Sequence, residues 1–381
     1  AIGKSSLTSL TSSTNNVAVG AFALEDDTSG GSNTAVGKDS LKNNTTASRN
    51  TALGTDTLEA NTTGEDNTAI GTFALNANTT ADNNTAVGKS ALLLNTTGTN
   101  NTAIGANSLD ACTTGSSNTA VGQDALGAAT EASNNTAVGH QTLDAVTTGG
   151  DNTAIGKGAL TSLSTGTQNQ CMGVNAGVNL TTGGLNTAIG AFALGTCQSG
   201  GSNVAVGHDA LLNTTSSNNT AVGHESLESN STGSANVAVG YRALQKNTTA
   251  SNNTAVGRLA LNKNTTATNN TACGSASLEF NTTGADNTGI GRLALNLNTE
   301  GNNNTAVGNT ALQSNTTGSS NTTVGEESFL SNTTGVNNCG LGTSAGRSNT
   351  TGSFNISIGH NSGRDNQTSN NNIAIGVNCQ L

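Results

Sequence analysis

Apolar and polar positions follow a pattern that repeats every 17 residues from one end of this chain to the other. The repeat reads Asn-Thr-Ala-Val-Gly-x-x-Ala-Leu-x-x-Asn-Thr-Thr-Gly-x-x, and its first glycine recurs from Gly3 through Gly20 to Gly376. A short fixed period with fixed apolar and turn positions predicts one small backbone unit stacked on copies of itself. We therefore expect an all-β parallel β-solenoid (β-roll or β-helix) of about 23 coils, forming one continuous domain over residues 1–381.

Two neighbouring columns of the repeat predict a short strand. The residue before each repeat glycine is apolar in all 23 copies and β-branched in 19, and we expect this column to face a core. The residue before that one is Ala in 18 copies and small in the others. Successive strand side chains point to opposite faces, so both faces of the strand should be crowded.

Other columns predict the remainder of the turn. Leu stands four residues after the glycine in 18 copies, and Asn stands four residues before it in every copy that contains the position. Asn amides can form ladders from coil to coil. In the Asn-Thr-Thr-Gly stretch we expect a turn with Gly64 at positive φ. The columns expected to carry the fold are exemplified by Gly37, Gly54, Gly71, Val36, Ile70, Ala35, Ala52, Leu41, Leu58, Asn50 and Asn67.

The pattern is interrupted in two ways. The interval from Gly207 to Gly223 is 16 residues, and the alignment places the missing residue between Leu211 and Asn213. A deletion inside a strand would turn side chains to the wrong face, so we expect a loop to absorb it and the strand columns to stay stacked. Separately, Gly replaces Leu in three repeats, two of them in the last 40 residues, and we expect atypical coils from about residue 340.

Composition narrows the function. Charged residues make up 9% of the chain, aromatic residues 2%, and the net charge is −10, which argues against a nucleic-acid partner. No apolar run is long enough for a membrane span, and the six cysteines lie too many repeats apart for intrachain disulfides. No nucleophile elbow, phosphate loop or Cys-x-x-Cys is present, so we expect neither an enzyme nor a cofactor.

All four histidines directly follow a repeat glycine. His208 and His224 fall in adjacent coils, close enough to share a metal ion. The same column elsewhere holds residues such as Lys38 and Arg258, which is typical of a solvated position. We therefore expect no metal site, with His208 and His224 as the candidates if there is one.

Two large apolar residues per 17 make a thin core, which leaves a lone coil under-supported. The small column, as at Ala18 and Ala35, would let another chain approach closely. We therefore expect a parallel homotrimer. An unusually flat core within a single chain is the alternative explanation of that column.

The phrase Asn-Thr-Ala-Val-Gly, with Asn-Val-Ala-Val-Gly at Asn203 and Asn236 and Asn-Ile-Ala-Ile-Gly at Asn372, resembles the head repeats of trimeric autotransporter adhesins. The longer unit is similar to repeats of phage and phage-like tail fibre proteins. The resemblance implies a left-handed parallel β-roll that associates as a trimer, in a virion tail fibre or at a cell surface. The chain opens within a repeat at Ala1, and we expect it to be a segment of a longer protein.

Together these features predict the structural shaft of a host- or surface-attachment fibre. Stacking at about 4.8 Å per coil would give a rigid spacer about 110 Å long that carries a recognition tip. One alternative is an adhesin head that binds a host glycan or protein along the solenoid surface. Another is an ice-binding solenoid, for which the Asn-Thr-Thr stretch lacks the expected Thr-x-Thr face because its two Thr residues are adjacent.

Overall fold

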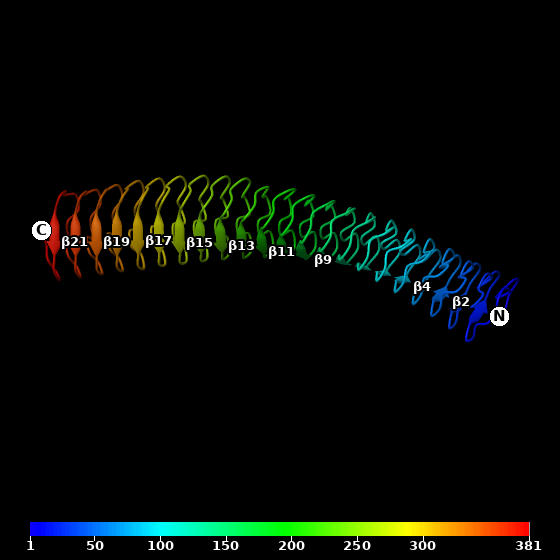
Figure 1. Cartoon of the computed structure of the whole chain (residues 1–381). Helices are drawn as coiled ribbons and strands as arrows, with labels where there is room; N and C mark the ends of the chain where they lie inside the picture. Colours follow the sequence, from blue (N-terminus) through cyan, green and yellow to red (C-terminus); the bar gives the residue numbers. More distant parts are fainter. Residues whose placement is uncertain (381) are drawn as a thin grey trace. The chain divides into compact units, whose positions relative to one another are not determined.

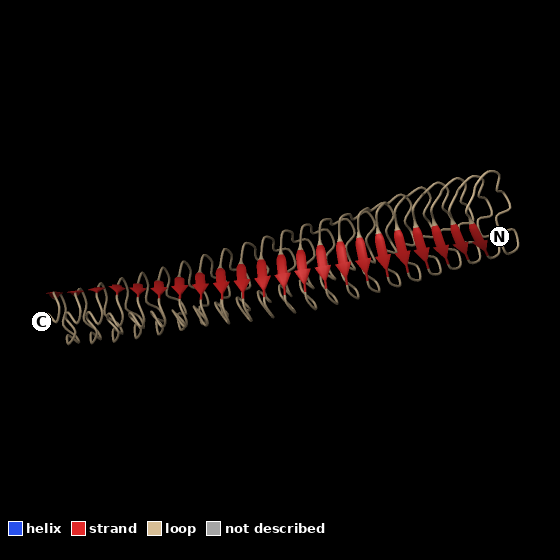
Figure 2. Ribbon diagram, turned by 90° about the horizontal axis from the view of Figure 1, so that it is seen from below, coloured by secondary structure: helices blue, strands red, loops and turns tan. Residues whose placement is uncertain are grey.

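The computed structural model describes residues 1–380 and contains two compact units, Ala1–Ala191 and Phe192–Leu381. Each unit is a parallel β-solenoid in which a turn contributes one three-residue strand, and the described residues contain no helix (Figure 1). The predicted fold class is confirmed. Within each unit the strands form a row along one side of the turns, and loops make up the rest of each turn (Figure 2).

The strand bounds follow the repeat. The first unit contains β1 Val17–Val19, β2 Thr34–Val36, β3 Thr51–Leu53, β4 Thr68–Ile70, β5 Thr85–Val87, β6 Thr102–Ile104, β7 Thr119–Val121, β8 Thr136–Val138, β9 Thr153–Ile155, β10 Gln170–Met172 and β11 Thr187–Ile189. The second contains β12 Val204–Val206, β13 Thr220–Val222, β14 Val237–Val239, β15 Thr254–Val256, β16 Thr271–Cys273, β17 Thr288–Ile290, β18 Thr305–Val307, β19 Thr322–Val324, β20 Cys339–Leu341, β21 Ile356–Ile358 and β22 Ile373–Ile375.

Neighbouring strands pair in register, so equivalent residues stack. Thr34 pairs with Thr51, Ala35 with Ala52 and Val36 with Leu53 across β2 and β3. Each column of the sequence repeat therefore becomes a column of side chains along the unit.

The small column lies inside the turn. Ala18, Ala35 and Ala52 are 0–1% exposed within their own chain. The prediction that Val36 and Ile70 face a core is wrong, because strand alternation places their column on the outer face, where both are half-buried. The small column is thus explained by the flat interior of one chain and is not a surface for another chain.

The leucine column fills the interior opposite the alanines. Leu41 and Leu58 are fully buried, as predicted, and both have left-handed backbone conformations with φ of 50° and 49°. This conformation is rare for a bulky residue. It recurs in this column because the turn must reverse direction while it directs the leucine inward, and the Leu41 amide still donates to the Thr57 carbonyl of the next turn.

The asparagine column forms the predicted ladder. Asn50 and Asn67 are fully buried, and the Asn67 amide donates to Oδ1 of Asn50 at 2.9 Å. Nδ2 of Asn50 donates to the Gly64 carbonyl at 2.9 Å. Each buried amide side chain of this column therefore gives a backbone amide of the next turn its acceptor, and it shares the Gly64 carbonyl with Nδ2 of Asn61, which donates at 3.0 Å.

The repeat glycines stack at van der Waals distance. Gly37 has φ of 139°, and a Cβ on it would lie 2.1 Å from the carbonyl oxygen of Gly54; a Cβ on Gly54 would lie 2.8 Å from that of Gly71. Both the backbone conformation and the space therefore require glycine. The expectation for Gly64 is wrong, because it has no positive φ and is needed instead for close approach to the Ala81 carbonyl.

The irregular turn keeps its strand register, since Val206 pairs with Val222 as predicted. The missing residue does not lie between Leu211 and Asn213. The backbone amides of both residues donate to carbonyls of the next turn, as the equivalent amides do in the regular turns. Thr215 is also regular, with its hydroxyl donating to the Ser231 carbonyl. The deletion is absorbed after Thr215, in the turn of the Asn-Thr-Thr-Gly stretch. This turn lies outside the strands, so its shortening leaves the strand register unchanged.

The glycines that replace Leu keep the same backbone. Gly346 has φ of 61°, close to that of the leucine column, and β20–β22 continue the in-register pairing. A Cβ on Gly346 would lie 2.4 Å from the buried ring of Phe329 one turn earlier. Gly346 therefore accommodates a larger neighbour.

Candidate functional site

The outer side of the strands forms a continuous uncharged surface in each unit. It consists of the first and third residue of every strand, and we call it the sheet face. Thr is the first residue in 15 of the 22 strands, and the third is aliphatic in all but β10, which has Met172, and β16, which has Cys273. No Asp, Glu, Lys, Arg or His occupies either column in any strand.

The aliphatic column of the sheet face is partly exposed along both units. Leu53 is 47% exposed, Ile104 40%, Val256 38% and Leu341 50%. An apolar surface that continues over many turns is typical of an interaction site and is uncommon on an isolated soluble domain. This surface was not predicted from the sequence, because the aliphatic column was expected to face the core.

Charged residues begin directly beside the sheet face. Lys38 and Lys89 follow repeat glycines on one side, and Arg49 and Asp66 precede the asparagine column on the other. Arg49 contacts Asp66 of the next turn, with 2.7 Å between Nε and Oδ1. The uncharged surface is therefore bounded, and its two columns differ from the variable columns around them.

The chain has two threonine columns that use their hydroxyls differently. In the Asn-Thr-Thr stretch, the Thr45 hydroxyl donates to the Thr62 carbonyl at 3.1 Å, and Thr62 repeats this bond to Thr79 at 3.0 Å. On the sheet face, hydroxyls such as those of Thr68 and Thr85 make no hydrogen bond to the described part of the chain. The first column links turns, and the second is left to contact water or another molecule.

His208 and His224 are brought together as the sequence predicted. Their rings stack with 5.5 Å between centroids and 13° between planes, and Tyr241 continues the stack 5.7 Å beyond His224. No group of three or more His, Cys, Asp or Glu side chains in residues 1–380 is arranged to hold a metal ion.

The cysteines are free thiols in the described chain. Burial raises the pKa of Cys112 to about 11, with a weaker opposing effect from a backbone hydrogen bond at Gly115. The buried Cys112 thiol is therefore protonated at neutral pH.

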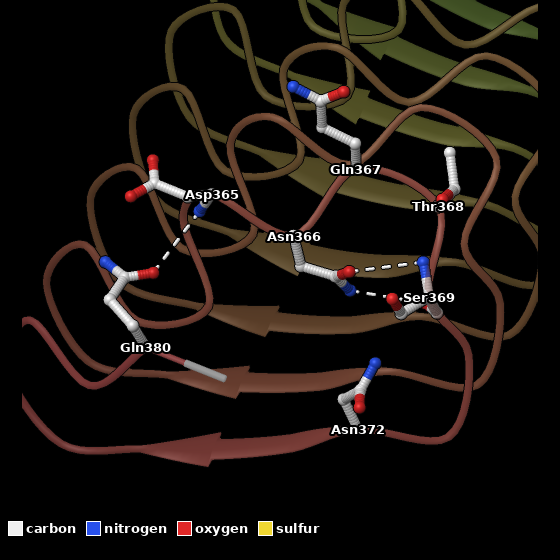
Figure 3. A pocket seen from close by; sticks show the side chains of 7 residues that line it. All are labelled: Asp365, Asn366, Gln367, Thr368, Ser369, Asn372 and Gln380. Atoms are coloured by element: carbon white, nitrogen blue, oxygen red, sulfur yellow. Dashed lines mark hydrogen bonds between the residues drawn. The ribbon is translucent and has the colours of Figure 1, made fainter.

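A hollow lies at the last described turns, lined by Asp365, Asn366, Gln367, Thr368, Ser369, Asn372 and Gln380 (Figure 3). Asn366 bonds both backbone groups of Ser369, and Gln380 accepts from the Asp365 amide. In earlier turns the equivalent surface is covered by the following turn, as the Thr333–Thr350 backbone bond shows. The hollow is thus the end of the last described turn, and its lining shows no catalytic grouping.

Comparisons with known proteins give no relative. No family model matches the chain, and neither the curated proteins nor the solved structures contain a match. Within residues 1–380, no helix is long and apolar enough to cross a membrane.

Proposed function

We propose that this chain is the structural shaft of a fibre that attaches a particle or a cell to a host or another surface. Copies of the chain associate through the sheet face to form a homotrimer. The observation that carries this proposal is the continuous uncharged sheet face, whose aliphatic side chains are partly exposed in both units.

A second copy of the chain is the partner that best matches this surface. The face repeats an uncharged first residue, most often Thr, and an apolar third residue on each turn, so a parallel copy with the same period can make a similar contact at every turn. Closed cyclic symmetry would bury the face of every chain at once. The number of three chains rests on the resemblance of the Asn-Thr-Ala-Val-Gly repeats to trimeric adhesin heads and tail fibres.

The connections between turns also support the proposed shaft role. Strand pairing, the asparagine ladder, the threonine bonds and the stacked glycines all connect one turn with the next. Such turns support one another as nearest neighbours, so whole turns can be removed while the others keep their contacts.

Deletion of residues 85–135, which are three whole turns, tests the shaft. The junction joins Asn84 to Thr136 and restores the repeat. We expect a folded chain with an unchanged number of copies, and a first unit shortened by about 14 Å in solution scattering. Deletion of residues 85–92 is the matched control, because it removes half a turn, breaks the register at the junction and should destabilise the turns beside it. If the three-turn deletion also unfolds or changes the number of copies, the shaft proposal is wrong.

A second candidate is direct binding of ice by the same face. The observation in its favour is the outer threonine column, which fills 15 of the 22 strands and whose hydroxyls make no hydrogen bond to the described part of the chain. The outward pair on most of these strands is Thr-x-aliphatic, so the absence of Thr-x-Thr does not exclude an ordered array. The test is the gap between the freezing and melting points of a solution of the chain. A gap that disappears in Ile104→Lys/Val138→Lys, and persists in Thr97→Lys/Thr114→Lys, would favour ice binding over self-association.

A further inference from the structure

A groove with a volume of about 560 Å³ lies on the surface of the second unit, and apolar atoms make up nearly all of its lining. Two columns of the repeat form it. The column six residues after the repeat glycine supplies Lys246, Lys263 and Phe280, and the first threonine of the Asn-Thr-Thr stretch supplies the opposite side. We call this feature the lysine groove. It shares no residue with the sheet face.

Threonine methyl groups make one side of the lysine groove apolar. The Thr248 hydroxyl donates to the Thr265 carbonyl at 3.0 Å, and the Thr265 hydroxyl donates to the Thr282 carbonyl at 3.2 Å. The Thr282 hydroxyl continues the series to the Thr299 carbonyl at 3.0 Å. Because the hydroxyls are engaged within the chain, the methyl groups are left to line the groove. The ring of Phe280, which is 40% exposed, extends this apolar lining.

The long side chains of this column are confined to a few turns. Small residues stand at the equivalent positions of turns before and after the groove, as at Ala111, Ala128, Ala145, Ser314 and Ser331. The repeat itself therefore does not require lysine or phenylalanine here. The lysine groove is a local feature of this part of the second unit.

Lys246 and Lys263 place two positive charges side by side. They stand in one column on consecutive turns, so their backbones are about 4.8 Å apart. Like charges directly opposite each other on neighbouring strands are destabilising, and the same repulsion acts between these stacked turns. Within residues 1–380, neither ammonium group forms an ion pair with a carboxylate. An anion bound between them would relieve this repulsion.

The acidic side chains close to the lysine groove have other partners. Oε2 of Glu228 and Oε2 of Glu279 accept amide hydrogen bonds from the following turn, at 2.8 and 3.2 Å. Oε2 of Glu225 lies 2.6 Å from Nε of Arg242. None of these three carboxylates lines the groove. The charge at the groove itself is therefore positive, although the chain as a whole carries −10.

We propose that the lysine groove binds a small anionic amphiphile, a carboxylate that carries an unbranched acyl chain. The carboxylate lies between the ammonium groups of Lys246 and Lys263, and the acyl chain runs along the threonine methyl groups past Phe280. The two turns from Lys263 to Thr299 provide about 10 Å for the acyl chain. A sugar fits this surface less well, because its hydroxyls would find few hydrogen-bonding groups in the lining.

Calorimetric titration of the full chain with dodecanoate, below the concentration at which it forms micelles, tests the proposal. We expect one equivalent per chain, with an affinity that falls as salt is added. Dodecyltrimethylammonium has the same apolar chain with a cationic head, and acetate has the head alone. Both should bind at least about tenfold more weakly than dodecanoate. Absence of dodecanoate binding, or equal binding of dodecanoate and dodecyltrimethylammonium, would overturn the site.

Replacement of the two lysines locates the carboxylate. Lys246→Gln/Lys263→Gln should weaken dodecanoate binding about tenfold and remove most of its salt dependence. Lys89→Gln/Lys157→Gln is the matched control, because it removes the same charge from exposed positions of the first unit. It should change neither the affinity nor its salt dependence. Equal effects of the two double variants would show that dodecanoate responds only to net charge, and the proposed site would be wrong.

Phe280→Ala tests the apolar part of the lysine groove. We expect dodecanoate affinity to fall at least about fivefold, whereas Phe73→Ala, which replaces a ring of similar exposure at 39%, should leave it unchanged. Circular dichroism of each variant should match the wild type, because both rings lie at the surface. If Phe280→Ala keeps full affinity, or if it lowers the number of copies in sedimentation, the groove does not serve this ligand and the proposal is wrong.

Discussion

Oδ1 of Asn33 accepts a hydrogen bond from the backbone amide of Asn50, one turn further along the chain, at 2.9 Å. Both side chains are fully buried, and Nδ2 of Asn33 also donates to the Ala47 carbonyl at 2.8 Å. One side chain thus satisfies a donor and an acceptor of the backbone in the next turn. Because few large apolar side chains are available per turn, this ladder is a principal connection between turns.

The ladder predicts a strong effect of Asn84→Ala. The Asn84 side chain accepts from the backbone amide of Asn101 at 3.0 Å, and its loss leaves that buried amide without this acceptor. The Gly98 carbonyl loses its bond from Nδ2 of Asn84 but keeps the bond from Nδ2 of Asn95 at 2.9 Å. We expect destabilisation of about 1–3 kcal/mol from the orphaned amide, measured by urea unfolding. Thr97→Ala, at an exposed position, is the control and should stay within about 0.5 kcal/mol of the wild type.

The stacked glycines predict that a single methyl group disrupts a turn. Gly88 has φ of 142°, and a Cβ there would lie 2.4 Å from the Gly105 carbonyl oxygen. We expect Gly88→Ala to destabilise the fold by more than about 1 kcal/mol and to raise hydrogen exchange in β5 and β6. Gly31→Ala is the matched control, because its Cβ would meet only the Thr14 carbonyl, at 3.4 Å. Equal exchange in the two variants would contradict the tight glycine stack.

Asp27 predicts a pH effect, because it stands where each of the next four turns has a buried Asn. Burial raises the pKa of the Asp27 carboxyl above 3.8, and hydrogen bonds from Gly30 and Asn44 oppose that shift only in part. The folded state therefore binds the Asp27 proton more tightly than the unfolded state does. The stabilisation from this proton is full below pH 3.8 and is lost as the pH rises through the raised pKa.

Asp27→Asn should consequently raise the unfolding midpoint at pH 7, and the difference from the wild type should shrink on acidification towards pH 3.8. The new amide can also donate to the Gly30 carbonyl, as Nδ2 of Asn44 does to the Ala47 carbonyl at 3.0 Å. Thermal unfolding of both chains between pH 3 and 8 checks this. A wild-type chain that is more stable than the variant at pH 7 would refute the prediction.

Much of the fold could be predicted from the sequence because each column is repeated many times. The strand, the buried Leu41 and the Asn50 ladder all followed from position within the repeat. The inner face of the strand did not, because the rule that places large apolar residues inside favours Val36 over Ala35. The left-handed backbone of the leucine column directs these side chains into the interior. They fill it and leave room only for small residues opposite, so the alanine column faces inward.

The candidate sites could be predicted only in part. Period alone placed His208 beside His224, but the stacking of their rings, with 5.5 Å between centroids, required coordinates. The sheet face was missed altogether. A signal for it was present, because the first and third strand positions never carry a charge although one face of a single solenoid must meet solvent.

Charge on the sheet face should separate the chains. Ile104 and Val138 are 40% and 36% exposed on this face, so each can be replaced without opening the core. We expect Ile104→Lys/Val138→Lys to remain folded and to sediment as a smaller species than the wild type, because like charges would then face each other in every contact. Thr97→Lys/Thr114→Lys, exposed on another side, should leave the number of copies unchanged.

The mass of the wild-type chain in solution tests self-association most directly. Sedimentation equilibrium at micromolar concentration should give three times the 37.4 kDa of one chain, together with a folded circular dichroism spectrum. A folded species of 37.4 kDa that persists at this concentration would contradict the homotrimer and leave the sheet face exposed to solvent.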